Sequence, residues 1–87
     1  MKSKKAFNKV LQVVGEGLAE LREKKGYRTI KEFTGKYDLP EIQYWRMEKG
    51  KTNLTLKSLV KILEIHDLSI HDFFCIITID EQSIGKL

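Results

Sequence analysis

The sequence predicts an all-α domain built around two short helices that are joined by a tight turn. The turn is indicated by Asp38-Leu39-Pro40, which separates two helical segments within residues 28–51. Apolar residues recur at helical spacing before and after this pair of segments, as expected for further helices that pack against it. Close to the C-terminus, a run of β-branched residues favours one additional short strand.

Length and composition are typical of a small globular domain. The chain has 87 residues, of which 41% are hydrophobic and 32% are charged. We expect one domain over residues 1–87, with a core over about 8–74 and a tail over 75–87. No apolar run approaches the roughly 18 residues of a membrane span, and the basic N-terminus lacks the apolar segment of a signal peptide. The sequence therefore predicts a cytoplasmic protein without a membrane partner.

The charges are unevenly distributed along the chain. Residues 22–61 contain eleven Lys and Arg against five Asp and Glu, whereas residues 62–87 contain one Lys against five acidic residues. A locally basic middle part favours contact with a polyanion. The alternative is an ordinary charged surface, because the net charge of the whole chain is only +4.

The first helix is expected over about residues 8–25, and Gly26 would end it. Its core side is predicted by apolar residues at helical spacing, which are Val10, Val14, Leu18 and Leu21, widened by Leu11 and Val13. Gly15 and Gly17 weaken its middle by roughly 1 kcal/mol each, and they permit either a kink or the close approach of another helix. The lysines before it form either a basic arm or helix surface: Lys2, Lys4, Lys5 and Lys9.

The two central helices have recognisable start and stop signals. Thr29 can cap the first of them, and Glu32 three residues later would complete a capping box. Pro40 suits the first position of the second helix, where its missing N–H is no loss, and it forces Leu39 into an extended conformation. Gly50 is expected to end the second helix in the left-handed conformation.

At 100° per residue, the second central helix, over about 40–49, has two different sides. One side is mostly apolar and carries Tyr44 and Met47, with Glu48 beside them. The opposite side carries Ile42, Arg46 and Lys49, flanked by Gln43 and Trp45. We expect the first side to face the core and the second to face solvent or a ligand.

Two further helices are expected before the C-terminus. Thr55 can cap a helix with a broad apolar face, formed by Leu56, Leu59, Val60, Ile62 and Leu63. Ser69 can cap a short last helix over 70–74. Residues 76–79 favour a strand, which would need a partner such as the same segment of a second copy. The alternative for the apolar segment 73–79 is packing against the first helix.

The single cysteine and the two histidines do not suggest a metal site. Cys75 lies among apolar neighbours, so we expect it to be buried filler rather than a reactive thiol. His66 and His71 lack a nearby cysteine partner, and they are expected at helix ends or on the surface rather than as ligands. No metal and no cofactor are predicted.

These elements resemble the lambda-repressor/Cro-like family, also called XRE-type helix-turn-helix domains, over residues 14–74. The most specific motif has the pattern apolar-x-x-apolar-Glu-x-Gly-Lys, formed here by Tyr44, Met47, Glu48, Gly50 and Lys51. The resemblance implies a five-helix fold that binds double-stranded DNA and lays the helix over 40–49 in the major groove. It also implies a structural ion pair between Arg22 and Glu48.

The chain departs from the family pattern at several positions. Ile30 stands where the family usually has a glutamine that contacts a phosphate. Thr34 replaces the usual small residue that faces the turn, and Asp38 replaces the usual turn glycine. Relative to the family pattern, one extra residue also lies between Gly26 and Thr29. These departures affect details of docking on DNA and leave the fold expectation unchanged.

From the exposed side and the N-terminal tip of the helix over 40–49, we expect contacts with base edges by Glu41, Ile42, Gln43, Trp45 and Arg46. Phosphate contacts are expected at the start of the preceding helix and after the second one, from Thr29, Lys31, Lys49, Lys51, Thr52 and Asn53. A homodimer on a two-fold symmetric site is the expected arrangement.

The sequence therefore predicts a sequence-specific transcriptional regulator, in particular a repressor. Two alternatives remain: an antitoxin-type regulator that also binds a partner protein, and a protein-interaction module that does not bind DNA. An enzyme is not expected, because the chain lacks a Ser/His/Asp or Cys/His set, a glycine-rich phosphate loop and a carboxylate pair in a plausible pocket.

Overall fold

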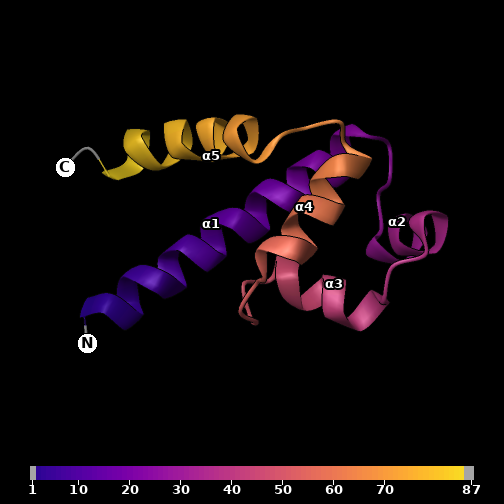
Figure 1. Cartoon of the computed structure of the whole chain (residues 1–87), viewed down its shortest axis with the longest axis horizontal. Helices are drawn as coiled ribbons and strands as arrows, with labels where there is room; N and C mark the ends of the chain where they lie inside the picture. The colour runs from indigo at the N-terminus through magenta and orange to yellow at the C-terminus, as the bar shows by residue number, and fades with distance from the viewer. Residues whose placement is uncertain (1, 86–87) are drawn as a thin grey trace. The chain divides into compact units, whose positions relative to one another are not determined.

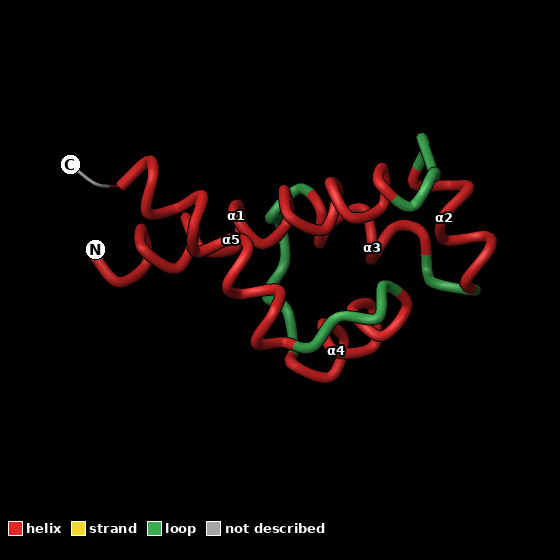
Figure 2. The backbone as a smooth tube through the Cα atoms, turned by 90° about the horizontal axis from the view of Figure 1, so that it is seen from above, coloured by secondary structure: helices red, strands yellow, loops and turns green. Residues whose placement is uncertain are grey.

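The computed structural model describes residues 2–85, which form five helices (Figure 1). They are α1 (Lys2–Lys24), α2 (Ile30–Tyr37), α3 (Glu41–Glu48), α4 (Leu56–Ile65) and α5 (Ile70–Gly85). The backbone of residues 2–85 contains helices and loops but no strand, as Figure 2 shows. The all-α prediction is confirmed. The chain divides into two compact units, one containing α1, α2 and α3 and the other containing α4 and α5.

Helix α1 begins at Lys2, six residues before the predicted start near residue 8. No glycine or proline precedes Gly15, so nothing in this part of the sequence interrupts the helix. Lys5 and Lys9 are exposed on it, which places these two on helix surface. The predicted core stripe is largely correct, because Leu11, Val14 and Leu18 are buried, whereas Val10 is exposed.

Gly15 lies where α1 approaches the C-terminal end of α3. A Cβ atom at this position would lie 2.7 Å from the Met47 carbonyl oxygen and closer still to that of Glu48. Only a residue without a side chain permits this approach. Of the two roles that the sequence left open for Gly15, the structure therefore assigns close packing between helices.

Helix α2 begins with the predicted capping box. The Thr29 hydroxyl accepts a hydrogen bond from the Glu32 N–H at 3.1 Å, and the Glu32 carboxylate accepts one from the Thr29 N–H at 3.4 Å. The helix ends at Asp38, which adopts the left-handed conformation with φ 57° and ψ 50°. Asp tolerates this conformation better than most residues, so the tight turn forms without a glycine at this position.

The turn leads directly into α3. Pro40 is the residue that precedes α3, and not its first residue as predicted, so the helix begins at Glu41. Gly50 follows with φ 66°, the left-handed conformation expected at the end of this helix. The Lys51 N–H donates to the Arg46 carbonyl at 2.9 Å, which satisfies one of the last carbonyls of α3. This loop is therefore attached to the helix.

The second unit corrects the prediction for the C-terminus. Residues 76–79 belong to α5 and form no strand. Ser69 caps the helix, since its hydroxyl accepts from the Asp72 N–H at 3.0 Å. Phe73 and Ile77 are both buried and are spaced one turn apart, so the apolar pattern fits a helix, and this packing overrides the β-branched composition. The strand-mediated dimer predicted for this segment has no strand to form it within residues 2–85.

Two smaller predictions for the second unit also need correction. Three of the five residues predicted for the apolar face of α4 are buried, namely Leu59, Ile62 and Leu63, whereas Leu56 and Val60 are exposed. Cys75 is exposed and not buried filler. No helix within residues 2–85 combines the length and apolar character needed to cross a membrane.

Candidate functional site

The two sides of α3 have the predicted opposite environments. Tyr44 and Met47 are buried, with 1% and 4% of their surface exposed, and Glu48 is buried beside them. The other side is open to solvent: Ile42 is 70% exposed and Trp45 41%, and Gln43, Arg46 and Lys49 are also exposed. Such a helix can present its outer side chains to a ligand without losing its anchor in the core.

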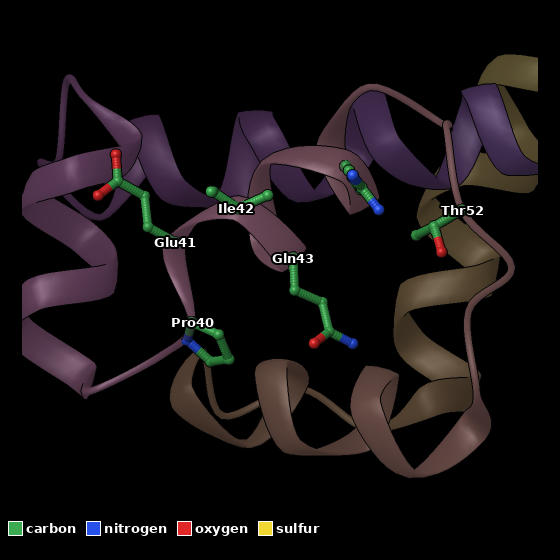
Figure 3. Close-up of a pocket in the computed structure, with 6 residues that line it drawn as sticks. Pro40, Glu41, Ile42, Gln43 and Thr52 are labelled. Atoms are coloured by element: carbon green, nitrogen blue, oxygen red, sulfur yellow. The ribbon is translucent and has the colours of Figure 1, made fainter.

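The outer side of α3 borders a concavity of about 680 Å³ (Figure 3). The close-up shows Ile42 and Gln43 on the helix and Thr52 on the segment that follows it. Its lining combines residues predicted to contact bases or phosphates with one residue that was predicted only as a turn residue, Pro40: Pro40, Glu41, Ile42, Gln43, Arg46 and Thr52. The helical spacing within α3 predicts that its own residues lie together. No sequence signal places Thr52 with them, because its position depends on the path of the loop.

An ion pair between Arg22 and Glu48 fixes α3 to α1. The Arg22 Nε atom donates to Glu48 Oε2 at 2.7 Å, and Nη2 donates to Oε1 at 3.1 Å. Both side chains are buried, with 7% and 2% of their surface exposed. A bidentate pair of this kind defines the orientation of both groups. The pair that the family resemblance implied is therefore present.

Arg22 has a second function that the sequence prediction missed. Its Nη1 atom donates to the carbonyl oxygens of Tyr27, at 2.9 Å, and Arg28, at 2.8 Å. One guanidinium thus holds both α3 and the loop between α1 and α2. Further acceptors for Arg22 could have been expected from the sequence, because arginine has five N–H donors and one carboxylate does not use all of them. The loop carbonyls that accept them could not be identified without the fold.

The Tyr44 phenol lies beside this ion pair. Burial raises the pKa of Tyr44 far above its usual value of 10.0, and the nearby Glu48 carboxylate raises it further. The hydrogen bond with Glu48 likewise raises the pKa of the Arg22 guanidinium. The raised pKa values keep the Arg22 guanidinium charged and the Tyr44 phenol un-ionised at neutral pH.

Aromatic rings hold the turn between α2 and α3. The Phe33 ring centroid lies 5.2 Å from that of Tyr44 and 5.2 Å from that of Tyr37, and Tyr27 packs edge-on against Phe33 at 5.6 Å. Contacts of this geometry stabilise by about 0.5–1.5 kcal/mol each beyond the area that they bury. The packing fixes α3 relative to α2, so that the outer side chains of α3 project from a rigid base.

The predicted phosphate-contacting residues lie at the start of α2 and after α3. All are exposed except Thr52, which is half-buried: Thr29, Lys31, Lys49, Lys51, Thr52 and Asn53. The Thr29 hydroxyl accepts in the capping box, which leaves its own proton for another acceptor. The Glu32 carboxylate lies next to it and would disfavour an anion there. Ile30 is half-buried, and its side chain has no group that could donate to a phosphate.

All of these candidate residues belong to the unit formed by α1, α2 and α3. Among the residues whose side chains the structure describes, Arg46 forms no ion pair, so its guanidinium is available to an external acceptor. The described part of the chain contains no group of three or more His, Cys, Asp or Glu residues placed to hold a metal ion.

The cysteine and one histidine contact each other on α5. Cys75 Sγ and His71 Nε2 lie 3.6 Å apart, and both residues are far in the sequence from the candidate DNA-contacting residues.

Comparisons of the chain with protein-family models, with curated proteins and with solved structures find no match.

Proposed function

We propose that this protein is a sequence-specific regulator of transcription that binds double-stranded DNA through α3. The observation that supports this most directly is the separation of the two sides of α3. Its inner side is fixed by Tyr44, Met47 and the Glu48–Arg22 pair, and its outer side leaves Arg46 exposed and without an ion-pair partner among the described side chains. A short, rigid helix with a free arginine is suited to the major groove.

The surroundings of α3 also suit a duplex. Exposed Lys31 lies on α2, and exposed Lys49 and Lys51 follow α3 in the chain, which gives cations before and after the helix for phosphates. The concavity beside α3 has polar groups from Gln43 and Thr52 at its rim. One such unit covers only a few base pairs, so we expect a homodimer that reads two half-sites of a symmetric operator and acts as a repressor.

A gel-shift experiment on random-sequence duplex DNA over a salt series tests the proposal. Binding through phosphates weakens steeply with salt, with a slope of about −0.9 in log K against log salt for each phosphate contact. Removing two contacts with Lys49→Gln and Lys51→Gln is expected to make the slope shallower by about 1.8. The same pair of changes at Lys57 and Lys61, exposed on α4, is the matched control and is expected to leave the slope unchanged.

A duplex affinity that does not depend on salt would contradict the proposal. So would an unaltered slope in the Lys49/Lys51 variant. Absence of DNA binding at low salt would favour the module that contacts only proteins. An antitoxin-type regulator would retain the salt dependence and would in addition form a stable complex with a second protein.

A further inference from the structure

We infer that the outer side of α3 selects a thymine followed by a guanine on one strand, a 5′-TpG step, and that it accepts 5-methylcytosine in place of the thymine. The inference rests on the DNA-binding function proposed above and adds the sequence that this surface reads. It is based on the placement of Ile42 and Arg46, which both line the concavity beside α3.

Ile42 is the first step of the argument. Its side chain is 70% exposed, more than any other large hydrophobic residue among the described side chains. An isoleucine at this position cannot form a hydrogen bond with a base edge. The only apolar group that a base pair offers in the major groove is the 5-methyl group of thymine, and 5-methylcytosine presents the same group. A buried methyl–isoleucine contact would also remove Ile42 from water.

Arg46 is the second step. It lies one helical turn after Ile42 and is exposed on the same side of α3. The forked guanidinium can donate two parallel hydrogen bonds to guanine O6 and N7, whereas adenine and cytosine present an amino donor in the major groove. Its donors are not committed to a carboxylate among the described side chains. Guanine is therefore the base that satisfies Arg46 best.

The spacing of the two residues joins these preferences into one step. Side chains four residues apart on a helix have Cβ atoms about 5–6 Å apart, and stacked base pairs are about 3.4 Å apart. The Cβ separation therefore corresponds to between one and two base-pair steps, and the long Arg46 side chain can reach the base pair next to the one that Ile42 contacts. In right-handed DNA the 5-methyl group of a pyrimidine lies against a guanidinium that is bound to the major-groove edge of the guanine that follows it on the same strand. The aliphatic part of Arg46 and the Ile42 side chain would enclose that methyl group while the guanidinium binds the guanine.

The first experiment is selection of bound duplexes from a random pool with four forms of the full chain. The wild-type protein is expected to enrich a TpG step in each half-site. Ile42→Ala is expected to retain the guanine and lose the preference for thymine. Arg46→Ala is expected to lose the guanine. Lys51→Ala, which would lose a phosphate contact, is the control and is expected to enrich the same step with weaker binding.

The second experiment isolates the methyl group. In the best selected duplex, deoxyuridine in place of the thymine removes only the methyl group, and the wild-type protein is expected to bind about fourfold more weakly, the effect of one buried methyl group. A duplex with 5-methylcytosine is expected to bind more tightly than the same duplex with cytosine by a similar factor. Both differences are expected to vanish in Ile42→Ala.

The outcomes separate this inference from the proposed function. A selected motif without a TpG step, or equal affinity for thymine and deoxyuridine duplexes, would overturn the inference while salt-dependent DNA binding still supported the function. Equal enrichment of the step by wild-type protein and by both α3 variants would also overturn it. Lack of binding to any duplex at low salt would contradict both.

Discussion

The Cα atom of Gly15 faces the carbonyl oxygen of Met47 so closely that even a methyl group would not fit between them. A Cβ atom added to Gly15 would lie 2.7 Å from that oxygen, a distance that real Cβ atoms essentially never show. Because both partners belong to helix backbone, neither can move aside as a flexible side chain could. Gly15 therefore sets the distance between α1 and the C-terminal end of α3.

Gly15→Ala is expected to destabilise the protein even though alanine favours helix formation. The gain in helix propensity is about 1 kcal/mol, but overpacking against backbone costs about 1–3 kcal/mol and would displace α3. Urea denaturation measures the net effect. The matched control is Gly35→Ala on α2, where an added Cβ meets nothing within 4 Å, and we expect it to raise stability. A stabilised Gly15→Ala variant would contradict the packing described.

Arg22→Ala is expected to lower the free energy of unfolding by about 3–5 kcal/mol, because it leaves the Glu48 carboxylate buried without its cation. Arg28→Ala retains the backbone carbonyl that Arg22 contacts and removes only an exposed side chain, so we expect an effect within about 0.5 kcal/mol. Thermal unfolding of the two variants tests the difference. Equal melting temperatures would refute a stabilising function of the pair.

The stability of the protein is expected to decrease above about pH 10 because of Tyr44. Its folded-state pKa is raised above the unfolded value of 10.0, so its contribution is complete below pH 10 and decreases as the phenol of the unfolded chain ionises. One such group changes the free energy of unfolding by at most about 1.4 kcal/mol per pH unit. Urea midpoints measured between pH 8 and pH 11 test this, and Tyr44→Phe should show a smaller decrease. Parallel curves for the two proteins would contradict the assignment.

The left-handed conformation of Asp38 at the end of α2 predicts the relative stabilities of two variants at this position. Asp38 has φ 57°, a conformation that costs most residues about 1–2 kcal/mol and glycine almost nothing. We expect Asp38→Gly to be at least as stable as the wild-type protein and Asp38→Ala to be about 1 kcal/mol less stable. Denaturation midpoints of the three proteins provide the measurement. An alanine variant as stable as the glycine variant would show that the turn does not require this conformation.

The proposed DNA contacts predict two different kinds of loss. Arg46→Ala is expected to cost about 1–3 kcal/mol of binding at one base position and to relax specificity there. Lys51→Ala is expected to weaken binding to all sequences alike and to reduce the salt slope by about 1. Affinities for a selected and a scrambled duplex separate the two effects. The same loss on both duplexes for Arg46→Ala would exclude its assignment to a base edge.

The central part of the fold was predictable because its signals are local. Thr29 and Glu32 define the start of α2, Asp38 and Pro40 define the turn, and Gly50 defines the end of α3, within a residue of the observed bounds. The spacing within α3 was enough to distinguish the buried residues from the exposed ones. Signals of this kind depend on residues that are neighbours in the sequence and not on tertiary contacts.

The errors occur where tertiary packing decides. Residues 76–79 have β-branched side chains, but Phe73 and Ile77 bury one side of a continuing helix, and local strand propensity is a weaker term than this burial. Cys75 is exposed on α5 because burial depends on helix phase and not on the polarity of its neighbours. The Tyr27 and Arg28 carbonyls could not be assigned to Arg22, because hydrogen bonds to backbone carbonyls leave no mark in side-chain identity.

Trp45 is the chain's single tryptophan, and its indole is 41% exposed on the outer side of α3 while the adjacent Tyr44 is buried. The emission of this indole can therefore be excited selectively at the red edge of protein absorption, without any attached dye. A change in its wavelength or quenching would report the occupancy of that side of the helix. Circular dichroism would report the helices themselves, so that ligand arrival and unfolding can be followed as two independent signals in one sample.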